Sequence, residues 1–207
     1  MKILVGCESS GAVRRLLRAR GHEAWSCDLL ASEDGSPHHL QGDVFEILAS
    51  QRWDMLIAHP PCTYLCVSGL HWNKRRPGRA EKTEEALVFF RQLWEADVPR
   101  IALENPIGCV SSRIAKPTQI IQPYQFGDDA SKATCLWLKG LPRLRPTVRL
   151  PGRVVMHNGK QVERWSNQTD SGQNRLGPSE DRWRERSRTY VGVATAMAEQ
   201  WTENLFP

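Results

Sequence analysis

The stretch Asp54-Met-Leu-Ile-Ala-His-Pro-Pro-Cys-Thr-Tyr-Leu-Cys66 decides the fold that this chain is expected to adopt. Its apolar run is as short as a buried strand, and the Pro-Pro pair ends that run and presents Cys62 beyond it. A second apolar run begins at Ile101 and carries Glu104-Asn105-Pro106. In an open α/β sheet, ligands and catalytic groups sit at the carboxyl ends of parallel strands. We therefore expect one thiol and one carboxylate at the same edge of a sheet.

Strand and helix patterns alternate outward from this stretch. The expected strands are short apolar runs, at residues 2–5, 23–27, 55–58, 101–103 and 133–139. The expected helices repeat apolar residues at helical spacing, at 12–20, 80–96 and 190–204, and a shorter helix is expected through Ile47-Leu48. Alternation of strands and helices is typical of an α/β protein with a doubly wound, mostly parallel, Rossmann-like sheet.

The chain changes character after Gly140. Residues 141–179 are rich in Pro, Gly, Arg and Asn, and Asn158-Gly159 between two apolar runs predicts a hairpin with a type I′ turn. We therefore expect a core at 1–140, a short basic insert at 141–181, and a C-terminal helix region at 182–207 that returns to the core.

Composition narrows the class of protein. With 207 residues, 40% of them hydrophobic, the chain is long enough for one domain with a substantial core. No apolar run approaches the roughly 18 residues that cross a bilayer, so we expect no membrane partner. Residues 1–5 are expected to form a strand rather than a signal peptide. Six scattered cysteines without a CxxC pair favour a reduced, cytoplasmic protein over a disulfide scaffold.

The charge balance indicates a polyanionic partner. Lys and Arg number 28 against 23 Asp and Glu, which gives a net charge of +5 and a pI of about 9.0. One basic cluster follows the Cys62 loop and another follows Gly140. Either cluster alone is as typical of a solvated basic surface as of a phosphate-binding one. Two clusters flanking a candidate nucleophile favour phosphate contact. The residues expected to contact the polyanion are Ser68, Lys74, Arg75, Arg76, Arg143, Arg145 and Arg153.

Cys62 and Glu104 are the candidate reactive groups. A cysteine reacts when its thiol is exposed and its surroundings favour the thiolate, and a stiff loop after Pro-Pro favours exposure. Glu104 follows a very apolar strand, where a carboxylate without a partner would be costly, so a role in a site is the natural explanation. A zinc site made of Cys62, Cys66 and either His59 or His71 is the alternative, but a second ligand pair is missing, and no metal is expected.

The ends of the first three strands carry residues suited to a cofactor. Gly6 and Gly11 bound the first turn, but the spacing matches neither GxGxxG nor GxxxxGK[ST], and a plain strand-to-helix turn remains the alternative. Asp28 ends the second strand, where a ribose-binding carboxylate normally sits. Together these features predict an adenosine-type cofactor without a phosphate clamp. Its expected lining residues are Gly6, Glu8, Gly11, Asp28, Leu29, Asp43, Val44 and Pro60.

Taken in order, these motifs resemble those of the DNA cytosine-5 methyltransferase family. The resemblance covers roughly residues 1–140 and the segment Tyr190-Val-Gly-Val-Ala194, and it is strongest for the short methylase-like proteins that phages and prophages carry. Its motifs are the Gly-rich turn Gly6–Gly11, the acid Asp28, Gly42-Asp43, Pro60-Pro61-Cys62 and Glu104-Asn105-Pro106.

The resemblance implies transfer of a methyl group from S-adenosyl-L-methionine to C5 of a flipped cytosine in DNA. Cys62 would add covalently to C6, and Glu104 would bind N3 and the exocyclic amine. Lys132 stands where the family has arginines, and would contact O2 of the base or a phosphate. The family's recognition domain would correspond to the minimal insert at 141–181. DNA methylation within a restriction-modification setting, in a bacterial or phage-infected cell, follows from the same resemblance.

Two alternatives remain at this point. The same fold would also suit modification of C5 of a pyrimidine in RNA, or transfer of a group other than methyl. A non-catalytic nucleic-acid-binding homologue is the alternative from another class. The sequence leaves the oligomeric state open, with a monomer as one alternative.

Overall fold

A computed structural model describes residues 1–180 and 182–203 of the chain. The chain divides into two compact units, one formed by residues 1–120 and 134–143 and the other by residues 121–133 and the chain from 144 onward. The expected boundaries at 140 and 181 remain a prediction. Among the described helices, none is both long and apolar enough to cross a membrane.

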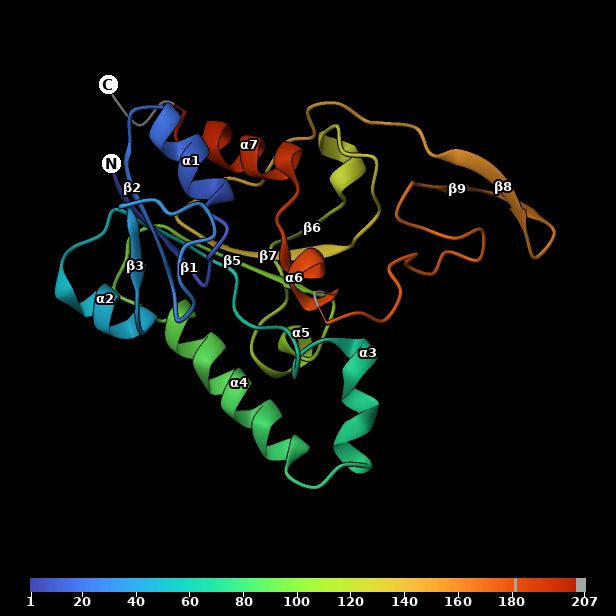
Figure 1. Ribbon diagram of the computed structural model, residues 1–207, viewed down its shortest axis with the longest axis horizontal. Coiled ribbons are helices and arrows are strands. Elements are labelled where there is room, and N and C mark those ends of the chain that lie inside the picture. The colour runs from blue at the N-terminus through green and yellow to red at the C-terminus, as the bar shows by residue number, and fades with distance from the viewer. Residues whose placement is uncertain (181, 204–207) are drawn as a thin grey trace. The chain divides into compact units, whose positions relative to one another are not determined.

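The first unit is built on a seven-stranded sheet (Figure 1). Strands β1 to β5 pair in parallel, and β7 pairs antiparallel to β5. This confirms the predicted α/β class with a mostly parallel, doubly wound sheet. In spatial order the strands are β3 (His39–Gln41), β2 (Glu23–Asp28), β1 (Lys2–Gly6), β4 (Met55–Ala58), β5 (Ile101–Pro106), β7 (Thr134–Lys139) and β6 (Gln119–Ile121).

Helices cover both faces of this sheet. Figure 1 shows α1 (Ala12–Ala19) on one side, and α2 (Val44–Ser50) and α4 (Arg79–Trp94) on the other. The second side holds a buried cluster in which Leu4, Leu56 and Leu103 pack with residues of α4 such as Phe90. Strands covered on both faces are apolar throughout rather than alternating, as the fully buried run Met55–Ala58 illustrates.

In the first unit, three short helical elements were not predicted from the sequence. They lie in the connections beyond β4 and β5, where the apolar pattern is too short to show a helical period. They are α3 (Val67–Leu70), the 3-10 helix η1 (His71–Lys74) and α5 (Val110–Arg113).

Strand β5 is longer than expected. The apolar run predicted an end at Leu103, and the parallel ladder to β4 does end there, at the pair Ala58–Leu103. On its other side β5 continues to Pro106, because the antiparallel partner β7 pairs with Glu104, Asn105 and Pro106. Glu104 therefore belongs to a part of β5 that β4 no longer accompanies, which places its carboxylate at the edge of the parallel ladder.

The second unit contains the predicted hairpin. Strands β8 (Arg153–His157) and β9 (Lys160–Arg164) pair antiparallel around Asn158-Gly159. Both turn residues have positive φ, 51° and 74°, as a type I′ turn requires, so this prediction is confirmed. The ring of Tyr124 stacks on Trp165 at 3.9 Å beside the hairpin. The remaining elements of this unit are η2 (Pro123–Phe126), α6 (Arg182–Ser187) and α7 (Val191–Gln200).

Candidate functional site

The carboxyl ends of β1, β2 and β3 converge. Gly6 pairs with Cys27 on one neighbouring strand and with Ala58 on the other. Burial raises the pKa of the Cys7 thiol far above its usual range, and the negative charges of Asp28 and Asp43 raise it further. The backbone NH of Gly42 donates a 3.0 Å hydrogen bond to the carbonyl oxygen of Asp28, so Asp28 and Asp43 lie at adjoining strand ends. The acids that follow β2 and β3 therefore lie at the same edge of the sheet as the turn after β1, and their role in binding a cofactor stays a prediction.

Glu8 is an unusual carboxylate in this turn. Its side chain is buried, and its Oε1 accepts a 2.7 Å hydrogen bond from the backbone of Val13 at the start of α1. Its Oε2 has no hydrogen-bond partner among the described residues. Burial raises the pKa of Glu8, while the positive charges of His59 and Arg14 oppose that rise. A buried oxygen that lacks a donor at a strand end suits a ligand's ammonium group.

The other residues predicted to line a cofactor site lie at the ends of β1, β2 and β3. Leu29 is 72% exposed directly after Asp28, and it offers an apolar surface to a flat ring. One oxygen of Asp28 accepts a hydrogen bond from the backbone of Leu30, and one oxygen of Asp43 caps α2 through the backbone of Phe45. Gly11 precedes α1 with a φ of 65°, and Val44 is buried. Asp28 and Asp43 offer carboxylates and Leu29 offers an apolar surface, a combination that suits the hydroxyls and the flat base of a nucleoside.

Cys62 follows β4 on an exposed turn. The backbone NH groups of Leu65 and Cys66 both donate to the carbonyl oxygen of Cys62. All six cysteines lie in the described part of the chain, and Cys62 is the only exposed one. Within the ranges 1–180 and 182–203, no group of three or more His, Cys, Asp or Glu side chains is arranged to hold a metal ion.

The loop that carries Cys62 is bonded to the segment after Glu104. The side-chain amide of Asn105 donates a 2.7 Å hydrogen bond to the carbonyl oxygen of the buried Pro60. Backbone bonds join Cys109 to Leu65 at 2.9 Å and Val67 to Ile107 at 3.1 Å. These bonds fix the position of the loop that carries Cys62 relative to β5, which carries Glu104.

Gly108 marks the closest approach of these two loops. A β-carbon at this position would lie 2.0 Å from the carbonyl oxygen of Leu65, so no larger residue fits without moving the backbone. The requirement for glycine here comes from contact rather than from backbone dihedrals.

His59 is the site residue whose role the sequence analysis missed. Its Nδ1 lies 3.2 Å from Oε2 of Glu104, and both side chains are largely buried. Its backbone NH donates a 3.0 Å hydrogen bond to the carbonyl oxygen of Gly6, so His59 lies between the end of β1 and the carboxylate of β5. The sequence pattern indicated His59 only as an alternative ligand of a zinc site. The available signal was its position, since the residue directly after a buried strand lies at the edge of the sheet where the carboxyl ends of neighbouring parallel strands meet.

Lys132 belongs to the second unit. Its Nζ donates a 2.9 Å hydrogen bond to the carbonyl oxygen of Arg186. It lines a pocket of about 320 Å³ with Ser131, Asn167 and Tyr190, and the Asn167 amide binds both the NH and the carbonyl of Ser131. The predicted contact of Lys132 with a target base remains a prediction.

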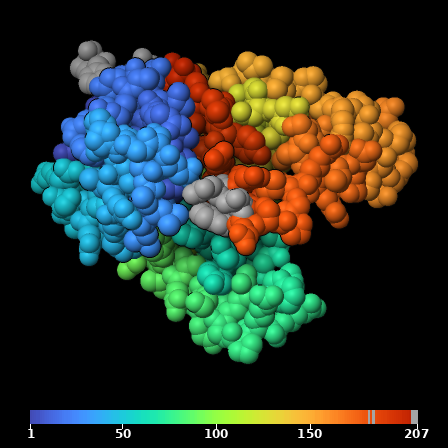
Figure 2. All heavy atoms as spheres, in the orientation of Figure 1, coloured from blue at the N-terminus to red at the C-terminus, as the bar shows by residue number. Residues whose placement is uncertain are grey.

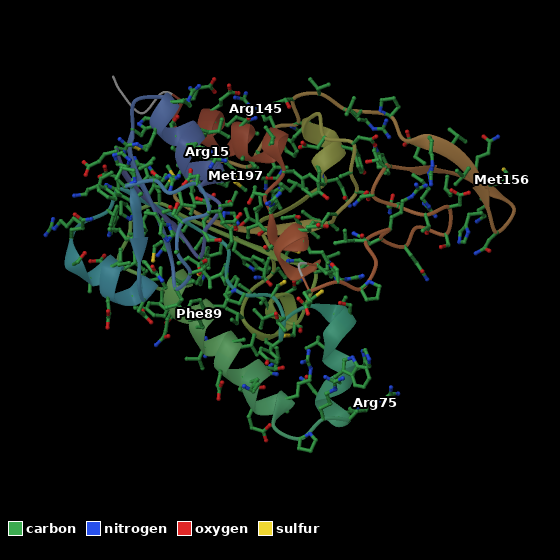
Figure 3. The ribbon with its side chains drawn as sticks, in the orientation of Figure 1. Arg15, Arg75, Phe89, Arg145, Met156 and Met197 are labelled. Carbon is green, nitrogen blue, oxygen red and sulfur yellow. The ribbon has the colours of Figure 1, made fainter. Side chains whose placement is uncertain are left out.

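The basic residues predicted to contact a polyanion are distributed over both units. In the first unit Ser68, Lys74, Arg75, Arg76 and Arg143 are exposed, and Figure 3 shows Arg75 pointing outward. In the second unit the side chain of Arg145 is 81% exposed. Arg153 differs, because its guanidinium is bound to the carbonyl of Gln168 and to Asp170. That arginine therefore contributes to the structure of the insert.

Comparisons with known proteins give matches among solved structures only. No protein-family model matches the chain, and no curated protein matches its sequence. A protein from an Escherichia coli prophage, named as a candidate DNA modification methyltransferase, is 14% identical over 72% of this chain and 52% of its own, with a TM-score of 0.47. The Entamoeba histolytica methyltransferase EhMeth is 14% identical over 72% of this chain and 57% of its own, with a TM-score of 0.48.

The Dnmt2 methyltransferase of S. pombe is 12% identical over 68% of this chain and 50% of its own, with a TM-score of 0.37. An rRNA methylase from Escherichia coli also matches, with a TM-score of 0.37. This chain spans between 50% and 57% of the length of these structures. The chain is structurally similar to methyltransferases at low sequence identity.

Proposed function

We propose that this chain is an S-adenosyl-L-methionine-dependent methyltransferase that acts on C5 of cytosine in DNA. The observation that carries the proposal is that the exposed thiol Cys62 and the carboxylate Glu104 lie on neighbouring strand ends, whose loops are joined by the Asn105 hydrogen bond and packed closely at Gly108. A nucleophile and an acid held at neighbouring strand ends suit addition to an electron-poor ring.

The residues after β1 and β2 fit the cofactor. Asp28 would bind the ribose hydroxyls, Leu29 would contact the adenine ring, and the buried Oε2 of Glu8 would accept from the amino group of the methionine moiety. S-adenosyl-L-methionine supplies an electrophilic methyl group when it is bound. The remaining chemistry belongs to side chains of this chain.

Cys62, as a thiolate, attacks C6 of the cytosine and forms a sulfur–carbon bond. The electron pair of the C5–C6 double bond shifts toward C4 and N3. Glu104 assists this shift, because its protonated carboxyl group donates a hydrogen bond to N3 and its other oxygen accepts one from the exocyclic amine. His59 holds Glu104 in orientation through the 3.2 Å contact at Oε2. C5 would then take the methyl group, and the bond between that methyl carbon and the sulfonium sulfur would break, with S-adenosyl-L-homocysteine as the leaving group. Loss of the C5 proton to solvent and expulsion of the Cys62 thiolate restore the aromatic ring.

The target base has to leave the stack for this chemistry. C6 must meet the thiol and C5 the methyl group, and the interior of a duplex gives access to neither. The exposed basic residues, such as Lys74 and Arg145, would neutralise phosphates and hold the DNA while the base is out.

Bisulfite sequencing of DNA from cells that express the protein tests this proposal. Wild-type protein should leave protected cytosines, and Cys62→Ser should leave none, because the serine hydroxyl is a far weaker nucleophile. Cys66→Ser is the matched control, since this neighbouring thiol is less exposed and is bonded to Ser68. Cytosine protection by the Cys62→Ser variant would remove Cys62 from the mechanism. Methyl transfer from labelled cofactor to RNA but not to DNA would overturn the assigned substrate.

A further inference from the structure

Directly after Cys62 the chain forms an exposed segment rich in aromatic and basic residues, which we call the arm and define as residues 64–82. It includes α3, η1 and the first turn of α4, and Figures 1 and 2 show it at the surface of the first unit. Its aromatic rings are those of Tyr64 and Trp72. Against the single acid Glu81 it carries five basic residues, Lys74, Arg75, Arg76, Arg79 and Lys82.

Trp72 is the centre of one aromatic–cation group. Its side chain is 36% exposed, and the guanidinium of Arg76 lies 4.5 Å from its ring centroid. Arg75 lies 5.9 Å from the same ring, and the ring of His71 lies 4.8 Å away. Trp72 lies outside the buried cluster that contains Phe90. An aromatic ring at the surface with guanidinium groups beside it is the arrangement by which proteins bind unpaired bases.

Tyr64 forms a second group nearer to Cys62. Arg79 lies 4.9 Å and Lys82 5.7 Å from the Tyr64 ring centroid. The guanidinium of Arg79 also donates a 3.0 Å hydrogen bond to the carbonyl oxygen of Thr63. The side chain of Arg79 therefore links the first turn of α4 to the turn that carries Cys62.

The buried Thr83 fixes the arm relative to this turn. Its Oγ1 lies within hydrogen-bond distance of the carbonyl oxygens of Tyr64, at 3.1 Å, and Arg79, at 3.2 Å. The same Oγ1 accepts a 2.9 Å hydrogen bond from the amide of Asn73 in η1. One buried hydroxyl thus ties together the Cys62 loop, the segment carrying Trp72 and the helix α4.

We propose that the arm binds DNA whose nucleotides beside the target cytosine are unpaired, with Trp72 stacking on one of those bases. A ring can stack on a base only where that base has lost its neighbour, and Arg75 and Arg76 are placed to contact the flanking phosphates. The inference rests on the proposed function for its placement beside a target cytosine. It deepens that function by naming the substrate as single-stranded or locally opened DNA.

Binding measurements without methyl transfer test the inference. In a Cys62→Ser background, fluorescence anisotropy would compare a labelled 20-nucleotide single strand with the duplex of the same sequence. Trp72→Ala should weaken binding to the single strand about 5- to 150-fold, the usual effect of removing one stacking ring, and should affect the duplex less. Trp72→Phe should retain most of the affinity. Arg76→Gln should weaken binding and lower the salt slope by about one.

Trp94 offers the matched control. It also contacts a cation, Lys139, but it stands at the other end of α4, about 22 Å from Arg79 along the helix axis. Trp94→Phe should therefore bind the single strand as the parent does. Thermal unfolding of each variant establishes that it is folded.

Three outcomes would overturn the inference: unchanged single-strand binding by folded Trp72→Ala, tighter binding of the parent to the duplex than to the single strand, or tighter binding to the matching RNA strand. These outcomes concern binding alone. Failure of wild-type protein to methylate DNA, together with single-strand binding that depends on Trp72, would overturn the proposed chemistry and leave only the binding of unpaired DNA by the arm standing.

Discussion

The side-chain amide of Asn105 donates a 2.7 Å hydrogen bond to the carbonyl oxygen of Pro60, across 45 residues of chain. Asn105 is 1% exposed, so this bond forms away from water. A buried carbonyl oxygen that lacks a hydrogen-bond donor would lower the stability of the fold. It joins the strand that carries Glu104 to the loop that presents Cys62. The distance between the two proposed reactive groups therefore depends on a residue that reacts with nothing.

Asn105→Ala should lower methyl transfer more than it lowers cofactor affinity. Loss of the donor frees the Pro60 carbonyl and lets the Cys62 loop move, and a small displacement of a reacting group is costly in rate. The free energy of unfolding should fall by about 1–3 kcal/mol for the unsatisfied carbonyl. Single-turnover kinetics and urea unfolding measure the two effects.

Ser112→Ala provides the comparison for Asn105→Ala. It removes another side chain to backbone bond from the same connection, to the carbonyl of Cys109, without touching Pro60. Its transfer rate should match that of wild type. An Asn105→Ala variant with wild-type turnover would show that the Cys62 loop holds its position without the amide.

Glu104→Gln should remain folded and should lower the transfer rate by about two orders of magnitude, the usual scale for loss of a positioned acid–base group. The amide keeps the volume and a donor but removes the group that exchanges a proton with N3. His59→Gln should give a smaller loss, because His59 contacts Glu104 rather than the substrate. Equal losses from the two variants, with normal folding, would argue that the pair acts as a unit. An unfolded Glu104→Gln protein would make the carboxylate structural.

Asp28→Ala should weaken S-adenosyl-L-methionine binding about tenfold or more and leave the rate at saturating cofactor little changed, since a hydrogen bond to a charged group is lost in the bound state. Isothermal titration calorimetry measures the affinity. Asp54→Ala is the control, because Asp54 accepts from the backbone of Lys2 at the opposite ends of the strands. Unchanged affinity in Asp28→Ala would place the cofactor elsewhere.

Asp34 should make stability fall in acid. Burial opposes its ionisation, but hydrogen bonds from Arg14, Ser32 and Arg15 outweigh that effect and hold the pKa of Asp34 well below its usual range. A folded-state pKa below the unfolded value means that the stabilisation is present above about pH 4 and is lost as pH falls through the folded-state pKa. Urea unfolding between pH 7 and pH 3 measures this loss.

The variant Asp34→Asn should be less stable than wild type at pH 7 by about 1–3 kcal/mol, because it leaves the buried Arg14 guanidinium without its carboxylate. Its stability should also change less between pH 5 and pH 3. The same acid loss in wild type and variant would assign the effect to other carboxylates.

Local patterns predicted much of the fold. The short apolar run at 55–58 became β4 because a strand buried on both faces needs apolar residues at every position. Asn158-Gly159 predicted its own turn, since both residues tolerate positive φ. The extension of β5 to Pro106 was missed, because its cause is the antiparallel partner β7, about thirty residues later in the chain.

The sequence by itself determined the order of the main strands and helices, and that a thiol and a carboxylate would lie at the ends of neighbouring strands, because the pattern of apolar residues and prolines is local. Only the tertiary structure decided how these groups are held. The contact of His59 with Glu104 and the bond from Asn105 to Pro60 both depend on the register of β4 against β5. That register arises from packing both faces of the whole sheet, which no short stretch of sequence specifies.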